Sequence, residues 1–201
     1  TTVSAVGYGM GARTAAWLKR KQMGGPVPKL DPRKKTITVR VQESDAPYLA
    51  KADSTWTDVV LQRLAQAFPD FNLVALCRYD YQVDEVKQKF GSRYIVPEEI
   101  VDGQGLLSAT DLFIGMGGTM NAEAALMGVP TISAFQGSLF TDGYLERVGL
   151  LAKVANAEAL VRNAGRFLAG DFKRGFGKKA RRVLDSMEDP VPKIAGFILK
   201  T

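Results

Sequence analysis

The chain has 201 residues, of which 46% are hydrophobic and 24% charged, a profile that suits one folded domain and is short for two. It contains no histidine and one cysteine, which excludes imidazole-dependent mechanisms, internal disulfides and zinc sites built from Cys or His. No apolar run approaches the roughly 20 residues that span a bilayer, and the first residues lack a signal-peptide pattern, so we expect a cytoplasmic protein without a membrane span.

The net charge of +6 is concentrated in three basic clusters, at 19–21, 33–35 and 173–182. Such clusters are most often solvated surface, and the functional alternative is an anionic ligand or a nucleic-acid backbone. No recognisable nucleic-acid-binding module accompanies them, so nucleic acid is not the favoured partner.

The first 30 residues fit a compact domain least well. We interpret 1–30 as an amino-terminal helix and linker and 31–201 as the main domain. The stretch "AVGYGMGA" superficially matches a dinucleotide fingerprint, with Gly7, Gly9 and Ala12 in the glycine positions. Its supporting strand would be very short, and no acid stands at the expected ribose position, so dinucleotide binding is not favoured.

From residue 31 onward, short apolar segments alternate with segments of helical spacing. The pattern predicts strands at 35–41, 71–77, 92–96, 111–115, 130–135 and 151–155. It predicts helices at 54–68, 82–90, 120–127, 141–149, 156–169 and 173–187, a short helix at most within 102–110, and a helical carboxy-terminal tail. Strands that alternate with helices imply a parallel sheet covered on both faces, which is an α/β, Rossmann-like, doubly wound fold.

The most informative stretch is "DLFIGMGGTMNAEAALMGVPTIS", residues 111–133. An apolar strand runs directly into Gly115, Gly117 and Gly118, which permit a tight turn and a close approach of a ligand to the backbone. Thr119 is the predicted N-cap of a helix that begins at Met120. Because ligands of open α/β sheets bind at the carboxyl ends of strands, this turn is a candidate phosphate site.

Glu123 is the residue of this helix that best distinguishes a ligand-binding role from a purely structural one. A carboxylate among Ala122, Ala124 and Ala125 is an unusual choice for plain packing, and one carboxylate can accept hydrogen bonds from both hydroxyls of a ribose. The structural alternative is a glutamate that interacts with the helix dipole or forms a capping box.

The segment "GGTMNAEAALMGVPTIS" resembles the donor-binding, carboxy-terminal half of the GT-B glycosyltransferase fold. It is similar to the cell-wall N-acetylglucosaminyltransferase and to the non-hydrolysing UDP-N-acetylglucosamine 2-epimerase. It also resembles an uncharacterised, largely archaeal domain-of-unknown-function family that is classed with these enzymes. Members of that family similarly carry an Arg near the end of a "TVR" strand, an Arg and a Gln after the next strand, and "DG" before "LL". The matching residues here are Arg40, Arg78, Gln82, Asp102 and Gly103.

The resemblance implies a ligand-binding set at these positions. Gly117, Gly118 and Thr119, with Met120 beside them, would face a pyrophosphate and Glu123 the ribose. Arg40 and Arg78 would add positive charge at neighbouring strand ends, unless each forms an ordinary surface ion pair. Gln82, Asp102 and Gly103 complete the implied set.

The implied function is binding of a nucleotide sugar, a UDP-sugar first of all, by one half of a GT-B-type glycosyltransferase or epimerase-like protein. The amino-terminal acceptor half would be a separate partner domain, so the isolated chain is expected to be incomplete as a catalyst, and no catalytic residue is identified. Neither a cofactor nor a metal is expected. The alternatives are a non-catalytic binding or assembly module of the same fold and a basic nucleic-acid-binding domain that uses 173–182.

Overall fold

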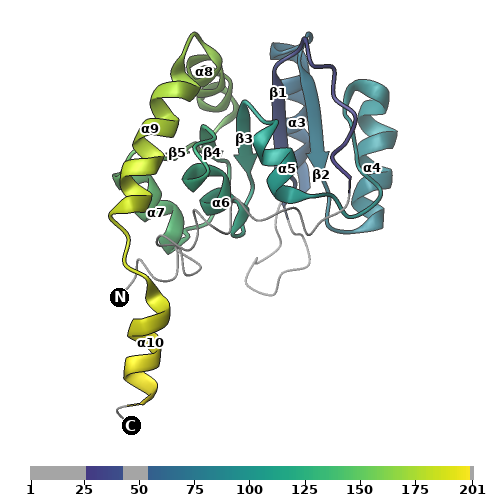
Figure 1. Cartoon of the computed structure of the whole chain (residues 1–201). Helices are drawn as coiled ribbons and strands as arrows, with labels where there is room; N and C mark the ends of the chain where they lie inside the picture. The colour runs from purple at the N-terminus through teal and green to yellow at the C-terminus, as the bar shows by residue number, and fades with distance from the viewer. Residues whose placement is uncertain (1–25, 43–53, 200–201) are drawn as a thin grey trace.

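A computed structural model describes residues 26–42 and 54–199, and the statements below concern these residues (Figure 1). Five parallel strands form one sheet. They are β1 (Thr36–Arg40), β2 (Asn72–Leu76), β3 (Leu112–Gly115), β4 (Thr131–Ser133) and β5 (Ala152–Lys153). The amino-terminal helix and the dinucleotide-like stretch predicted within 1–30 lie outside the described residues. Of the predicted linker, residues 26–30 are irregular, and Val27 and Leu30 pack against β2 and the helix at 103–108.

The spatial order of the strands is β2-β1-β3-β4-β5, so the chain adds β2 on one side of β1 and all later strands on the other. In the register of β1 and β3, Arg40 lies opposite Gly115. The direction of winding therefore reverses between these two strands, and in open α/β sheets such a switch point is where ligands bind.

Helices cover both faces of the sheet (Figure 1). One face carries α3 (Ser54–Ala67), α4 (Asp80–Phe90) and α8 (Ala157–Leu168). The other carries α5 (Gly103–Ser108), α6 (Met120–Leu126), α7 (Phe140–Arg147) and α9 (Phe172–Asp185). The predicted Rossmann-like α/β architecture is confirmed, and the helices begin and end close to their predicted positions.

Successive side chains of each strand point alternately to the two faces of the sheet, so the strands contribute to the core on both faces. In β3, Leu112 and Ile114 face α3 and α8, whereas Phe113 points to the opposite side, toward α5 and α6. In β2, Leu73 and Val74 divide in the same way. Because successive side chains of a strand point to opposite faces, a sheet buried on both sides requires nearly continuous apolar strands, as observed here.

The predicted strand at 92–96 is wrong. Residues Gly91–Arg93 form a 3₁₀ helix, η1, and only Ile95 pairs with the sheet, through a single parallel bridge to Val74. The Ile95 N–H donates to the Leu73 carbonyl and the Ile95 carbonyl accepts from Ala75 N–H. Pro97 has no N–H to continue the ladder, so the pairing ends after one residue.

The last helix, α10 (Pro190–Ile198), extends away from the sheet beyond the end of α9 (Figure 1). Within 26–42 and 54–199, no helix is long and apolar enough to cross a membrane.

Buried polar side chains connect the glycine turn to α7. Asn121 donates from Nδ2 to both carboxylate oxygens of Asp142, at 3.2 and 3.1 Å, and the Ser133 hydroxyl lies 2.5 Å from Asp142 Oδ2. All three residues are buried. A Cβ placed on Gly115 would lie 1.6 Å from Asn121 Oδ1, so the end of β3 must be glycine for Asn121 to keep this position.

We therefore expect Gly115→Ala to destabilise the fold by about 2–4 kcal/mol, because the new methyl group displaces Asn121 and breaks buried hydrogen bonds. Urea unfolding followed by circular dichroism measures the change. The control is Gly165→Ala in α8, where a Cβ meets nothing within 4 Å. Removal of a helical glycine should there increase stability by about 0.5–1 kcal/mol. Equal stability of both variants would contradict the packing described for Asn121.

Candidate functional site

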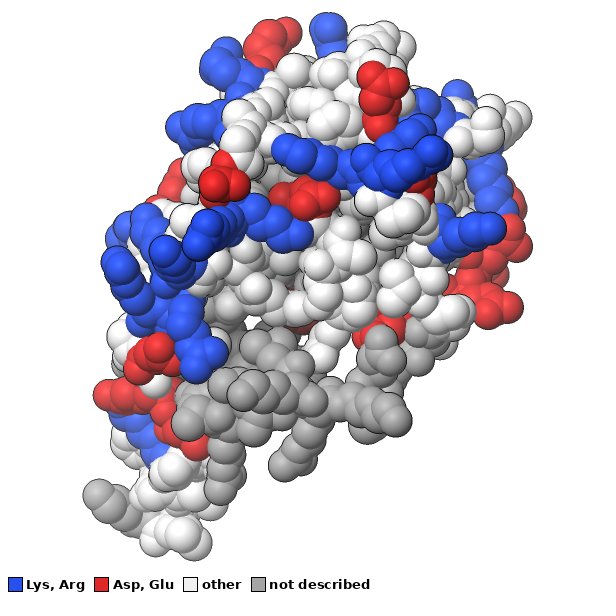
Figure 2. All heavy atoms as spheres, turned by 45° about the horizontal axis from the view of Figure 1, so that its top comes forward, with Lys and Arg blue, Asp and Glu red and all other residues white. Residues whose placement is uncertain are grey.

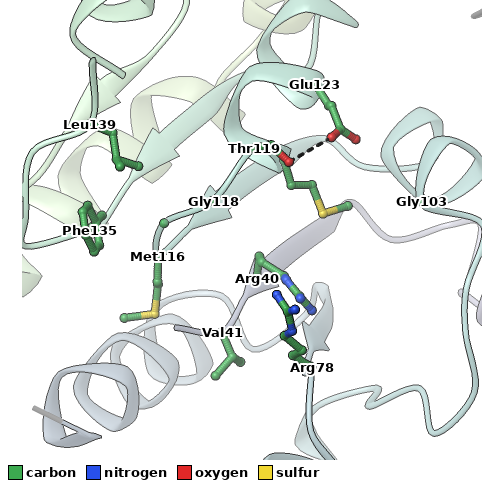
Figure 3. A pocket seen from close by; sticks show the side chains of 12 residues that line it. Arg40, Val41, Arg78, Gly103, Met116, Gly118, Thr119, Glu123, Phe135 and Leu139 are labelled. Carbon is green, nitrogen blue, oxygen red and sulfur yellow. Dashed lines mark hydrogen bonds between the residues drawn. The ribbon is translucent and has the colours of Figure 1, made fainter. Parts of the chain in front are cut away.

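A pocket of about 310 Å³ lies at the carboxyl ends of β1 and β3, at the switch point (Figure 3). Its lining comes from the ends of β1, β2 and β3, the first residue of α5, the start of α6 and the loop after β4. The lining residues are Arg40, Val41, Arg78, Gly103, Met116, Gly117, Gly118, Thr119, Met120, Glu123, Phe135 and Leu139. Eight of the ten predicted ligand-binding residues are thus brought together, and Gln82 and Asp102 are not among them.

The glycine turn forms the floor of the pocket. Gly117 has φ +110° and Gly118 has φ +85°, both in the region that L side chains rarely adopt. A Cβ on Gly117 would also lie 3.3 Å from the Phe135 ring. The turn therefore depends on these two glycines, as the sequence predicted.

Two arginines occupy one side of the pocket. Arg40 is the last residue of β1 and Arg78 follows the adjacent strand β2, and their side chains lie next to each other in Figure 3. Arg40 donates to the carbonyls of Cys77, at 2.9 Å, and Leu76, at 3.4 Å, which holds its guanidinium at the strand ends. Arg78 also lies over the Tyr79 ring, with 5.8 Å from Cζ to the ring centroid.

The adjacent guanidinium groups give this side of the pocket a positive charge, which favours an anion. Burial, and secondly the neighbouring positive charge of Arg78, lower the pKa of Arg40. Within the described part of the chain, Arg40 has no carboxylate partner. Two cations placed together without a neutralising acid at Arg40 favour an anionic ligand between them.

Glu123 and Thr119 lie on the opposite side of the pocket. The Thr119 hydroxyl donates to Glu123 Oε1 at 3.3 Å (Figure 3). Thr119 occupies the N-cap position as predicted, but its side chain forms no capping hydrogen bond. Glu123 stands one residue beyond the capping-box position, so the alternative of a capping box is not what the structure contains. Since α6 has only seven residues, the arginines rather than the helix dipole dominate the charge of the pocket.

Gln82 does not line the pocket and instead connects the segments that follow β1 and β2. Its Oε1 accepts from the backbone N–H of Arg78 at 3.0 Å, and its Nε2 donates to the Gln42 carbonyl at 2.8 Å. The side chain is buried. Gln82 therefore fixes the segment after β2 relative to the segment after β1, and with it the separation of Arg40 and Arg78.

Asp102 has a structural role at the start of α5. Its Oδ1 accepts from Gln104 N–H at 3.1 Å as the N-cap, and the residue is buried beside Gly105. Gly103, the next residue, does line the pocket.

An apolar wall completes the pocket. It consists of Val41, Met116, Phe135 and Leu139, which lie on the side away from Glu123 in Figure 3. The sequence analysis did not identify these four residues. Val41 and Met116 directly follow strand ends, and Phe135 follows β4, so the rule that strand ends share one edge could have found them.

No group of three or more His, Cys, Asp or Glu side chains in the described ranges is arranged to hold a metal ion.

The comparisons with known proteins agree with this geometry. A family model described as "Protein of unknown function (DUF354)" matches residues 27–195. The chain belongs to this family. A relative, the uncharacterized protein MJ0665 of Methanocaldococcus jannaschii, is 42% identical over 77 residues, which are 38% of this chain and 22% of that protein.

Two solved structures illustrate the likeness of this DUF354 chain. Spinosyn forosaminyltransferase SpnP has a TM-score of 0.59 and 17% identity, over 91% of this chain and 46% of that one. The UDP-GlcNAc 2-epimerase of Methanocaldococcus jannaschii, solved in complex with UDP-GlcNAc and UDP, has a TM-score of 0.55 and 14% identity, over 91% and 51%. The chain spans about half the length of these proteins. The predicted likeness to one half of a GT-B fold is confirmed.

The reactivity of the Cys77 thiol provides a test of the packing beside Arg40. Burial raises the pKa of its thiol to about 11. As the only cysteine, it should react with a disulfide reagent at pH 8 roughly 100-fold more slowly in the native chain than in the urea-unfolded chain, because only the thiolate attacks. The native rate should rise with pH up to about 11. Equal native and unfolded rates at pH 8 would show that Cys77 is not held as described.

Proposed function

We propose that the pocket binds the nucleoside diphosphate of a nucleotide sugar, a UDP-sugar first of all, and that the chain is the donor-binding half of a GT-B-type glycosyltransferase or an epimerase-like protein. One observation carries the proposal: Arg40, Arg78 and Glu123 line one pocket together with a turn of two positive-φ glycines, at the switch point of the sheet. The similar folds of a glycosyltransferase and a UDP-GlcNAc 2-epimerase support it.

The positions of the positive and negative side chains determine how the ligand would be oriented in the pocket. A diphosphate is attracted to Arg40 and Arg78 and repelled by the carboxylate of Glu123, so the phosphates belong on the arginine side. Glu123 is left for neutral hydroxyl donors, and a ribose diol supplies two of them. Backbone N–H groups of the turn at Gly117 and Gly118 add donors for phosphate oxygens because glycine allows close approach.

The same arrangement suits departure of a nucleoside diphosphate. When the bond from the anomeric carbon to the diphosphate breaks, negative charge grows on the leaving phosphate oxygen. Cations and N–H donors fixed beforehand stabilise that charge more than they stabilise the intact donor, and this lowers the barrier. A base that activates an acceptor would come from the other half of a GT-B cleft.

A test of ligand identity uses a titration of UDP, UDP-sugars, dUDP and inorganic pyrophosphate, followed by calorimetry. We expect UDP to bind, and Arg40→Gln to weaken both UDP and pyrophosphate by roughly 10- to 100-fold, since a charge-assisted hydrogen bond contributes about 1.5–3 kcal/mol. Arg63→Gln is the matched control, because Arg63 is an exposed cation on α3 outside the pocket.

Glu123→Gln provides the second half of that test. If Glu123 accepts from the ribose, the wild-type chain prefers UDP over dUDP by roughly tenfold, and the variant loses this preference while it keeps its affinity for pyrophosphate. A variant that weakens pyrophosphate as much as UDP would contradict the ribose role. No binding of any UDP or other nucleoside diphosphate to the wild-type chain would end the proposal.

Turnover is a separate prediction. We expect the 201-residue chain to release no UDP and to form no C2 epimer from UDP-sugars above the uncatalysed background. The proposed site would bind the donor but would not position an acceptor, and binding alone does not accelerate the reaction. Coupled detection of UDP and chromatography of the sugar measure both. Turnover that is lost in Glu123→Ala would show that this single domain is a complete enzyme. Donor binding without turnover, even with an acceptor domain supplied, would instead favour a non-catalytic binding module.

A further inference from the structure

The hydrogen-bond ladder between β3 and β4 ends one bond earlier than its register allows. In this pair the Phe113 N–H donates to the Pro130 carbonyl at 2.9 Å. Donors on one edge of a strand recur at every second residue, so the same register directs the Gly117 N–H to the Ala134 carbonyl. The Ala134 N–H does bond to the Gly115 carbonyl, at 2.9 Å, but no hydrogen bond joins Gly117 to Ala134.

Trp56 supplies the donor that stands in place of Gly117. The indole N–H of Trp56 donates to the Ala134 carbonyl at 2.7 Å. Ala134 is fully buried, so without this donor its carbonyl would be unpaired in the interior, which is costly and rare in folded proteins. An indole N–H donates and cannot accept, so it suits a single carbonyl.

The chain path places Trp56 at this point. Trp56 is the third residue of α3, the helix that connects β1 to β2. A helix between two parallel strands returns the chain to its starting edge, so α3 begins at the carboxyl ends of the strands. Trp56 packs against the core cluster that contains Met116 and Ala134, and it does not line the pocket. Its indole therefore meets the end of β4 from within the core.

Gly117 leaves the ladder with its N–H unpaired. Its φ of +110° turns the backbone out of the strand, and a Cβ at this position would lie 3.3 Å from the ring of Phe135. Within the described part of the chain, no group accepts a hydrogen bond from the Gly117 N–H. Gly117 is half-buried and lines the pocket, so this N–H is a donor that a ligand can use.

We propose that Trp56 is a positioning residue of the phosphate site. Its indole takes the place of the Gly117 N–H at the Ala134 carbonyl, so β3 can end there and the Gly117 N–H is left for a phosphate oxygen. The inference rests on the proposed function, in which this turn binds a diphosphate. Trp56 does not touch the ligand and acts through Ala134 and Gly117.

Loss of the indole N–H should return Gly117 to the ladder. In Trp56→Phe the register makes the Gly117 N–H the alternative donor for the buried Ala134 carbonyl, and glycine adopts an extended backbone without steric cost. The same N–H is then no longer available to a phosphate. A hydrogen bond to a charged group contributes roughly 10- to 100-fold in affinity, which is the loss expected for pyrophosphate.

Calorimetric titration of pyrophosphate and UDP into the whole 201-residue chain tests the proposal. We expect Trp56→Phe to weaken both ligands by roughly 10- to 100-fold. Tyr94→Phe is the matched control, because the buried Tyr94 hydroxyl donates to the Leu61 carbonyl at 2.8 Å, away from the pocket. This control loses the same type of bond and should lower the Tm while it keeps the wild-type affinity.

Surface cations require a second control. Figure 2 shows Lys and Arg side chains gathered over α9, where pyrophosphate can be attracted without a specific site. Arg174 and Lys178 are exposed on this helix. The double variant Arg174→Gln, Lys178→Gln should leave the affinity for pyrophosphate unchanged at about 0.15 M salt, where exposed charges are largely screened.

Hydrogen exchange followed by NMR reports on Gly117 directly. In the isotope-labelled wild-type chain we expect the Gly117 N–H to exchange rapidly and to shift when pyrophosphate binds, and the Trp56 indole N–H to exchange slowly. In Trp56→Phe the Gly117 N–H should become protected by roughly tenfold or more, and in Tyr94→Phe it should not. A purely structural role of Trp56 would not slow the exchange of a glycine N–H. The wild-type measurements need no variant.

The outcomes separate this inference from the proposed function. If the wild-type chain binds neither pyrophosphate nor UDP, the proposed function fails, and the role of Trp56 fails with it. If the wild-type chain binds both and Trp56→Phe binds them equally well, only the role of Trp56 is wrong. The same conclusion follows if Tyr94→Phe weakens binding as much as Trp56→Phe. A Gly117 N–H that is protected in the wild-type chain, or that does not shift when pyrophosphate binds, would also overturn the inference.

Discussion

The pairing of β1 with both β2 and β3 determines where chemistry is possible in this molecule. Because β1 lies between strands that were added in opposite directions, Arg40 at its end stands directly opposite Gly115 and close to Arg78 on the far side. Hydrogen bonds of a central parallel strand leave no freedom in this placement, since a slip of one residue would reverse every buried side chain. The cations, the glycine turn and the carboxylate of Glu123 therefore meet because of strand order, and loop sequence only selects which groups are presented.

A rigid layer of buried polar side chains supports this edge. Asn121, Asp142 and Ser133 tie the start of α6 to β4 and α7, and Gln82 ties the segments that follow β1 and β2. The bonds join residues that lie 9, 21 and 40 positions apart in the sequence, so they connect different elements of the fold. Because the interior has a low dielectric constant, loss of one of these bonds would be costly. Binding groups held by such contacts lose little conformational freedom when a ligand arrives, which preserves affinity.

The sequence could predict the fold because the buried strands are continuous apolar runs and the helices are periodic. It could also predict that Arg40, Arg78 and Glu123 meet, since parallel strands end at one edge. The failure at 92–96 has a local cause, because Pro97 limits pairing that the apolar residues before it favour. The structural roles of Gln82 and Asp102 could not be foreseen, because both bind backbone groups whose positions depend on loop conformation. That these residues and the rest of the predicted set contact a ligand stays a prediction.

The central position of β1 also governs the order in which the sheet is assembled. Within this domain, β1 is synthesised first, yet its partners lie 36 residues later for Asn72 and 75 residues later for Leu112. Until both exist, Ile37 and Val39 remain an apolar strand with unpaired edges, and pairing must await the closure of two long loops. Non-local parallel pairing of this kind slows folding and prolongs exposure to aggregation. The switch point needs both pairings, so on a growing chain it can form only after β3, which ends at Gly115, has been synthesised.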